Sequence, residues 1–176
     1  VHDVANRRKL TDSTLLFELG TVLDHISSKV SLPDASFAHR DFHSRNLMLQ
    51  QDGSLALLDF QDALFAPPFY DLVSLLFDPY VPLSERIRDE ASAAYTGVMG
   101  QSLDALDNPV LLWVALQRLL KAIGTYAFQS QRLGRGQFEP YIAIAEERAV
   151  TIARRLPSEI SAHAVDLLSR LGFKTA

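Results

Sequence analysis

Two short apolar segments with polar residues at their outer ends place the strongest constraint on how this chain folds. The segments span 46–50 and 55–59, and the Asp-Gly pair at 52–53 between them is a turn signal. This pattern predicts a buried β-hairpin. Because the strands of a hairpin run side by side, its open end brings Asn46, at the start of the first strand, close to Asp59, at the end of the second.

The remainder of the chain is patterned for helices. Apolar residues recur at helical spacing, and the predicted helices span 13–28, 70–77, 84–99, 109–131, 140–156 and 158–171. Ser84 and Ser158 stand at N-cap positions, Pro140 suits a first helical turn, and Gly172 suits the position after a helix end. The expected fold class is therefore mainly α with a small β-hairpin, in the α+β class.

Composition sets the size of the fold and excludes several classes of function. With 176 residues, 48% of them hydrophobic, the chain is expected to form one domain over 1–176. A formal charge of -4 without blocks of like charge argues against a nucleic-acid partner. The chain contains no run of about 18 consecutive apolar residues, so no membrane-spanning helix is predicted. The absence of cysteine excludes a thiolate metal site and fits a cytoplasmic location.

Polar residues capable of chemistry gather around the predicted hairpin. Asp41 opens a loop that ends at Asn46, and Asp59 closes the second strand. Phosphoryl transfer needs magnesium held against phosphates and a carboxylate that orients the attacking hydroxyl. Amide and carboxylate oxygens are ligands that magnesium prefers. We therefore expect Asn46 and Asp59 to hold Mg²⁺ and Asp41 to accept or orient the proton of an acceptor hydroxyl.

The amino-acid sequence of this region resembles the active-site motifs of protein kinases. Residues 39–46 read His-Arg-Asp-Phe-His-Ser-Arg-Asn, similar to the catalytic loop H-R-D-x-x-x-x-N, and residues 59–61 read Asp-Phe-Gln, similar to the metal motif D-F-G. By this resemblance Asp41 is the catalytic aspartate. His43 takes the place of a lysine that contacts the transferred phosphate, as a hydrogen-bond donor or partial cation.

Departures from the protein-kinase pattern point to a small-molecule kinase. Only eleven residues separate Asp59 from Asp71, too few for the segment on which a peptide substrate lies. The chain instead resembles the aminoglycoside phosphotransferase family, whose members phosphorylate antibiotics, choline, homoserine and sugars. Segments 39–43, 59–63 and 70–76 look most like the N-acetylmuramate/N-acetylglucosamine kinases within that family. The resemblance implies ATP or another nucleoside triphosphate, Mg²⁺ and a small-molecule acceptor as cofactors and partners.

The same resemblance assigns supporting roles to two further residues. His39 and Asp71 would brace the catalytic loop, Asp71 by accepting the N–H groups of the loop backbone. An acidic residue at the start of a helix is also favoured by the helix macrodipole, without any site. Asp62 is a candidate contact to the acceptor.

The resemblance further implies a protein-kinase-like C-terminal lobe whose N-terminal lobe is absent. The catalytic loop would be 39–46, the metal motif 59–62 and the helical remainder 70–172. No glycine-rich phosphate loop precedes the catalytic loop, and the chain begins without methionine, so we expect either that a preceding segment is missing or that the chain works together with another. The chain alone is expected to bind nucleotide weakly and to turn over negligibly. It is also expected to self-associate through the apolar surface that the absent N-terminal lobe leaves exposed.

Two alternatives of other classes remain open. His39, Asp41 and His43 alternate, so on a strand they would share a face and could bind the metal of a hydrolase. Alternatively, the kinase-like residues belong to a non-catalytic module that retains them as a scaffold or a nucleotide sensor.

Two further sets of residues have both a functional and a structural interpretation. Four basic residues either line an acceptor or phosphate pocket or are solvated near helix ends: Arg118, Lys121, Arg132 and Arg135. Five aromatic residues either form a platform for a sugar or adenine or belong to the core: Phe60, Phe65, Phe69, Tyr70 and Phe77.

Overall fold

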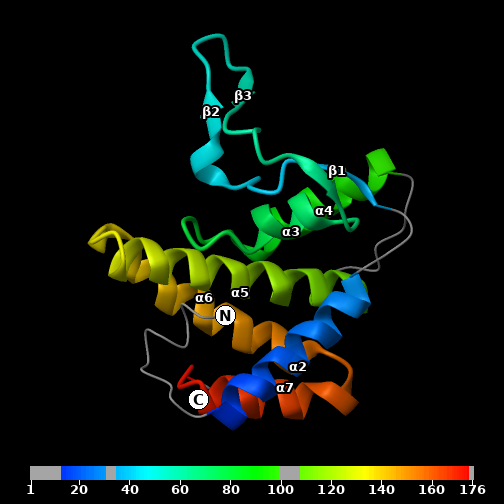
Figure 1. Cartoon of the computed structure of the whole chain (residues 1–176). Coiled ribbons are helices and arrows are strands. Elements are labelled where there is room, and N and C mark those ends of the chain that lie inside the picture. The colour runs from blue at the N-terminus through cyan, green and yellow to red at the C-terminus, as the bar shows by residue number, and fades with distance from the viewer. Residues whose placement is uncertain (1–12, 31–34, 100–107, 175–176) are drawn as a thin grey trace.

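The computed structural model describes residues 13–30, 35–99 and 108–174. Helices make up most of it, and two small antiparallel sheets lie at one end (Figure 1). The elements, in chain order, are α2 (Ser13–Val30), β1 (Ser36–Ala38), the 3₁₀ helix η1 (Ser44–Asn46), β2 (Leu47–Leu49), β3 (Leu55–Leu57), β4 (Leu64–Ala66), α3 (Tyr70–Leu76), α4 (Glu85–Met99), α5 (Pro109–Gln131), the 3₁₀ helix η3 (Gly136–Phe138), α6 (Glu139–Arg155) and α7 (Ser158–Arg170).

Helix α5 is the centre of the core. It packs against α2, α3 and α6, and buried apolar side chains run along it from Leu111 to Ala127. Its N-terminus is capped by Asn108, whose side-chain oxygen accepts hydrogen bonds from the backbone N–H groups of Val110 and Leu111. By length and composition α5 could cross a membrane, but 61% of its most apolar window is buried inside the protein, as in a central core helix.

The predicted hairpin is present as β2 and β3. Leu47 pairs with Leu57 and Leu49 pairs with Leu55, and the backbone N–H of Leu58 donates to the carbonyl of Asn46 at 2.9 Å. This last bond closes the open end of the hairpin. The second sheet, formed by β1 and β4, was not predicted, because its two strands are far apart in the chain and no turn signal joins them as the Asp-Gly pair joins β2 and β3.

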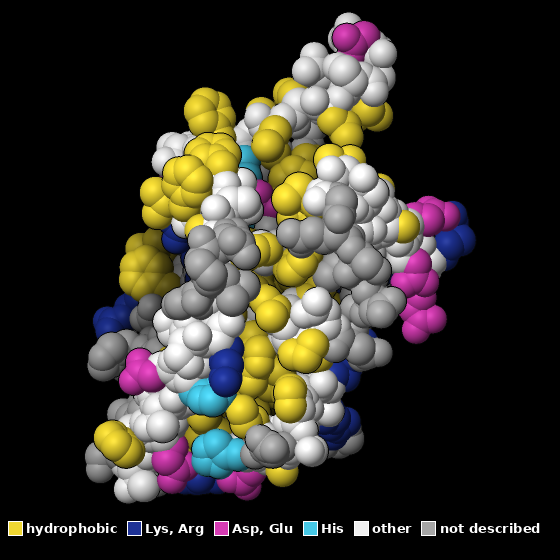
Figure 2. All heavy atoms as spheres, turned by 90° about the vertical axis from the view of Figure 1, so that its right-hand side faces the viewer, with side chains coloured by type: hydrophobic (Ala, Val, Ile, Leu, Met, Phe, Trp, Pro, Cys, Tyr) yellow, Lys and Arg dark blue, Asp and Glu magenta, His cyan; other side chains and the backbone are white. Residues whose placement is uncertain are grey.

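The prediction that the hairpin is buried is wrong. It projects away from the helices (Figure 1), and the side chains of Leu49 and Leu55 are 71% and 68% exposed. Figure 2 shows hydrophobic side chains on the surface at and below the hairpin. Apolar composition predicted burial, but no helix in the described part of the chain covers either face of the hairpin.

The six predicted helices all form, with ends within two residues of the predicted ones. Pro140 lies in the first turn of α6, and Ser84 accepts a hydrogen bond from the Ile87 N–H at the start of α4. Gly172 adopts φ 79° after α7, which few residues other than glycine favour. The N-cap prediction for Ser158 is wrong: this residue is the first of α7, and the N-cap is Pro157, whose ring offers no side-chain acceptor.

The five aromatic residues singled out in the sequence divide between core and surface. Phe69, Tyr70 and Phe77 are buried, as the core interpretation predicts. Phe60 and Phe65 are 71% and 69% exposed, because they lie at the base of the projecting hairpin and on the short β4 strand.

Candidate functional site

A cavity of about 340 Å³ lies where the hairpin meets α5. Five of the seven residues predicted to form the site line it: Asp41, His43, Asn46, Asp59 and Asp62. The other two, His39 and Asp71, line a separate apolar groove between the hairpin base and helices α3 and α4. The structure therefore brings the catalytic loop and the metal motif together at one cavity.

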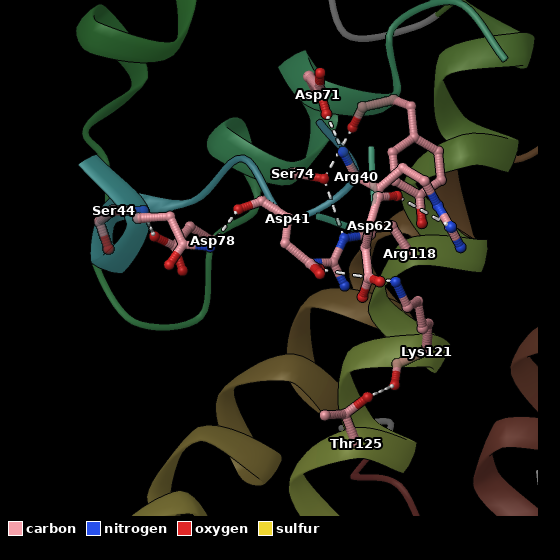
Figure 3. Close-up of polar contacts among 12 residues, drawn as sticks. Arg40, Asp41, Ser44, Asp62, Asp71, Ser74, Asp78, Arg118, Lys121 and Thr125 are labelled. Atoms are coloured by element: carbon pink, nitrogen blue, oxygen red, sulfur yellow. Dashed lines mark hydrogen bonds and ion pairs between the residues drawn. The ribbon is translucent and has the colours of Figure 1, made fainter. Parts of the chain in front are cut away.

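Asp71 contacts the backbone of the catalytic loop with both carboxylate oxygens (Figure 3). Its Oδ2 accepts the N–H of His39 at 2.7 Å, and its Oδ1 accepts the N–H of Arg40 at 2.9 Å. Arg40 adopts φ 71°, a left-handed conformation that costs energy in a residue other than glycine. The two hydrogen bonds hold this turn in place, and the turn directs Asp41 toward the cavity.

His39 links the loop to the second strand of the hairpin. Its side chain is buried, and its Nε2 lies 2.9 Å from the carbonyl oxygen of Leu58, the residue before Asp59. Catalytic loop and metal motif, which are far apart in sequence, are thus joined through one imidazole.

Asp78 is a residue of the site that the sequence analysis missed. Its carboxylate is buried and accepts the backbone N–H groups of Ser44 and Tyr80, each at 2.8 Å, while Arg148 donates to its carbonyl. The hydrogen bond to Ser44 fixes the second half of the catalytic loop. An Asp-Pro pair after α3 indicates only a turn in sequence, so its long-range partners gave no signal.

Two cations from α5 face the carboxylate of Asp41 (Figure 3). The Nη2 of Arg118 lies 3.1 Å and the Nζ of Lys121 lies 3.7 Å from the same oxygen, Oδ1. Arg118 also donates through Nε to the Oγ of Ser74 at 3.0 Å. Among the described residues, Oδ2 of Asp41 has no hydrogen-bond donor, so it remains available to a hydroxyl.

Asn46 and Asp59 offer the oxygen atoms expected for a magnesium site. The Nδ2 of Asn46 donates to the backbone carbonyl of Asp41 at 2.9 Å, which leaves the amide oxygen available. Gln61 donates to Oδ1 of Asp59, which leaves Oδ2. Asp59 adopts φ 63°, a left-handed conformation that redirects the chain after the strand. An amide oxygen and a carboxylate fit a hard cation such as Mg²⁺.

His43 is poorly suited to carry a positive charge here. Burial is the largest cause that lowers the pKa of its imidazole, against the opposing effect of the Asp78 carboxylate. Its ring packs edge-on against Tyr80, and Nδ1 is buried without a hydrogen-bond partner in the described part of the protein.

The geometry required by the metal-hydrolase alternative is not present. Strand β1 ends at Ala38, so His39, Asp41 and His43 do not share the face of a strand. The Nε2 of His39 is occupied by a backbone carbonyl. Within the described ranges no group of three or more His, Cys, Asp or Glu side chains is arranged to hold a metal ion.

Two of the four basic residues singled out in the sequence belong to the site. Arg118 and Lys121 line the cavity, whereas Arg132 and Arg135 do not; Arg135 donates to the side-chain oxygen of Gln129, a residue that does line the cavity. Aromatic side chains do line the cavity, although not those predicted. They are Tyr80, Tyr126 and Phe138.

Comparison with known proteins assigns the family. The model of the phosphotransferase enzyme family (APH) matches residues 2–134, well over half of the chain. The chain belongs to this family. The match includes the catalytic loop, the metal motif and the two α5 cations of the cavity.

Individual members of the phosphotransferase family are similar over part of the chain. An N-acetylmuramate/N-acetylglucosamine kinase of Neisseria meningitidis serogroup B is 39% identical over 116 residues, 60% of this chain and 33% of that protein. The same kinase of Pseudomonas aeruginosa is 36% identical over 58% of this chain and 32% of its own length. The same kinase of Caulobacter vibrioides is 38% identical over 38% of this chain and 20% of its own length. The chain thus spans about a third of the first two relatives.

Proposed function

We propose that this chain is the catalytic, C-terminal-lobe part of a small-molecule kinase that transfers a phosphoryl group from ATP to a hydroxyl of an amino sugar. The single observation that carries the proposal is that Asp41, Asn46 and Asp59 line the same cavity. These are the three oxygen-bearing side chains that the kinase interpretation requires together, and they come from a loop and from the two ends of a hairpin.

In the proposed reaction, Asp41 orients the acceptor hydroxyl. The hydroxyl oxygen forms a bond to the terminal phosphorus of ATP, and the bond from that phosphorus to the bridging oxygen breaks, with its electron pair leaving on ADP. The hydroxyl proton passes to Oδ2 of Asp41, the carboxylate oxygen that the α5 cations leave open.

Asn46 and Asp59 would hold Mg²⁺ through their amide and carboxylate oxygens. When bound, Mg²⁺ neutralises charge on the phosphate oxygens. The residues present fit this ion because each retains one oxygen without a protein donor in the described part of the chain. Hydrogen bonds from the loop backbone to Asp71 and Asp78 keep the arrangement in place before substrate arrives.

The names of the relatives favour N-acetylmuramate or N-acetylglucosamine as the acceptor. The cavity walls are compatible with a sugar, because aromatic rings contact the apolar face of a sugar while amide and hydroxyl side chains bind its hydroxyls. Tyr126 and Phe138 supply rings, and Thr125 and Gln129 supply polar groups on the same wall. Aminoglycosides, choline and homoserine are the alternative acceptors.

The decisive variant is Asp41→Asn in the full-length protein. We expect kcat to fall by about 10²- to 10⁴-fold, because the amide cannot take the hydroxyl proton. ADP release would be measured with each acetylated amino sugar, an aminoglycoside, choline and homoserine. Asp89→Asn, an exposed aspartate on α4, is the matched control and should leave kcat unchanged.

Full activity of the Asp41→Asn variant, with folding shown by circular dichroism, would overturn the proposed role of Asp41. A wild-type protein that binds nucleotide but releases no ADP with any acceptor would favour the non-catalytic module. The isolated chain should turn over negligibly, because it spans only about a third of the relatives and lacks a glycine-rich phosphate loop.

A further inference from the structure

We infer that Lys121, on α5, supplies the positive charge that contacts the transferred phosphoryl group. This inference rests on the proposed function, which it extends. The cation would come from a helix 80 positions after the catalytic aspartate, and not from the catalytic loop where the resemblance to kinases placed it.

The position of Lys121 carries the first part of the argument. Its Nζ lies 3.7 Å from Oδ1 of Asp41, and the side chain points from α5 into the cavity (Figure 3). A hydroxyl bound to Asp41 is the atom that receives the phosphoryl group. A cation beside Asp41 is therefore within reach of the phosphoryl oxygens, on which negative charge is spread in the transition state.

The second part of the argument is that the ammonium group of Lys121 has unused hydrogen-bond donors. Arg118 lies closer to Asp41, and its guanidinium is held on two sides, by that carboxylate and by Ser74. The distance from Lys121 to Oδ1 exceeds a hydrogen bond, and no described residue accepts a hydrogen bond from its Nζ. A half-buried ammonium whose three donors are unused is available for an anion that arrives with the substrate.

The two cations therefore have different roles. Arg118, whose side chain is only 12% exposed, positions the Asp41 carboxylate. Lys121, whose side chain is 37% exposed on a flexible stem, can leave Asp41 and follow the phosphoryl group during transfer. In the absence of nucleotide, Asp41 is its nearest anionic partner.

Kinetics of the full-length protein test the role of Lys121. Lys121→Met should lower kcat by about 10²-fold, with little change in the KM for the sugar, because the lost contact forms in the transition state. Lys121→Arg should restore part of the rate, since it retains the charge. Lys29→Met, an exposed lysine on α2, is the control and should behave as wild type. A kcat for Lys121→Met within about threefold of wild type would overturn the inference.

The choice of acceptor separates phosphoryl contact from acceptor recognition. N-acetylmuramate carries a carboxylate and N-acetylglucosamine does not, so a lysine that binds the acceptor carboxylate would matter only for the first. We expect the same fold-loss in kcat for both sugars. A loss confined to N-acetylmuramate would overturn the inference and assign Lys121 to acceptor binding.

Amine labelling gives a readout that does not depend on turnover. In the full-length protein with Mg²⁺, a non-hydrolysable ATP analogue should protect Lys121 from acetylation, whereas ADP should not, because only the analogue carries a γ-phosphate. Equal acetylation of Lys121 in both complexes would contradict the inference. If no acceptor were phosphorylated, the proposed function would fail, yet this labelling would still decide whether Lys121 meets the terminal phosphate.

Discussion

At the scale of single residues, Asp71 shows how one side chain stabilises a strained loop. Its two carboxylate oxygens accept the N–H groups of His39 and Arg40, the second of which has a left-handed backbone. A strained backbone conformation of this kind persists only where contacts with the surrounding structure hold it in place. The loop that presents Asp41 is thus fixed by hydrogen bonds to its backbone. Such bonds do not depend on which side chains the loop carries.

Even the conservative substitution Asp71→Asn, which exchanges one oxygen for an NH₂ group, should destabilise the protein. In Asp71→Asn one oxygen becomes an NH₂ that faces a backbone N–H, so a part-buried donor loses its acceptor, and we expect a loss of about 1–3 kcal/mol in the free energy of unfolding. Urea denaturation of the full-length protein measures this. Asp89→Asn, on the exposed face of α4, should change it by less than about 0.5 kcal/mol. Equal stability of wild type and Asp71→Asn would show that these bonds do not hold the loop.

At the scale of elements, α5 connects the core to the cavity. It packs against α2, α3 and α6, and it carries Arg118 and Lys121 toward Asp41, with Arg118 also bonded to Ser74 of α3. The position of both cations therefore depends on where the helix starts and how it is rotated. Asn108 fixes the start by capping the first turn, and Pro109 prevents an earlier one.

Loss of this cap should weaken the helix in a measurable way. Asn108→Ala removes the acceptor for the Val110 and Leu111 N–H groups, and we expect a loss of about 1 kcal/mol in the free energy of unfolding. Asn108→Asp keeps a side-chain oxygen and is the matched control. Thermal or urea unfolding of both variants decides the matter: if alanine and aspartate are equally stable, the cap does not contribute.

At the scale of the whole molecule, the surface around the hairpin is unusually apolar. Both cross-strand partners Leu49 and Leu55 are largely exposed, as is Phe60 near the hairpin base. Exposed apolar patches of this kind mark interaction surfaces or sites of aggregation. The described residues leave this surface open.

We predict that the isolated chain self-associates through this surface. Light scattering should show an apparent mass that rises with concentration. The double substitution Leu49→Thr and Leu55→Thr should reduce this, because threonine keeps the strand propensity while it removes apolar area. A monodisperse monomer at every concentration would contradict the prediction, as would unchanged association of the double variant.

The sequence by itself determined the local elements and the composition of the candidate site. Helical periodicity and caps set the six helices nearly to the residue, because these signals are local. The Asp-Gly turn set the hairpin, and the spacing of Asp41, Asn46 and Asp59 along it predicted that the three would meet, as they do at the cavity.

Only the tertiary structure decided what lies beside those elements. The exposure of the hairpin, the pairing of β1 with β4, the hydrogen bonds of Asp78 and the approach of Lys121 to Asp41 all depend on segments brought together over long distances in sequence. A single sequence carries no local pattern for such contacts, because they follow from how helices pack. The positive charge that faces Asp41 therefore comes from side chains of the packed helix α5, far from the loop in sequence.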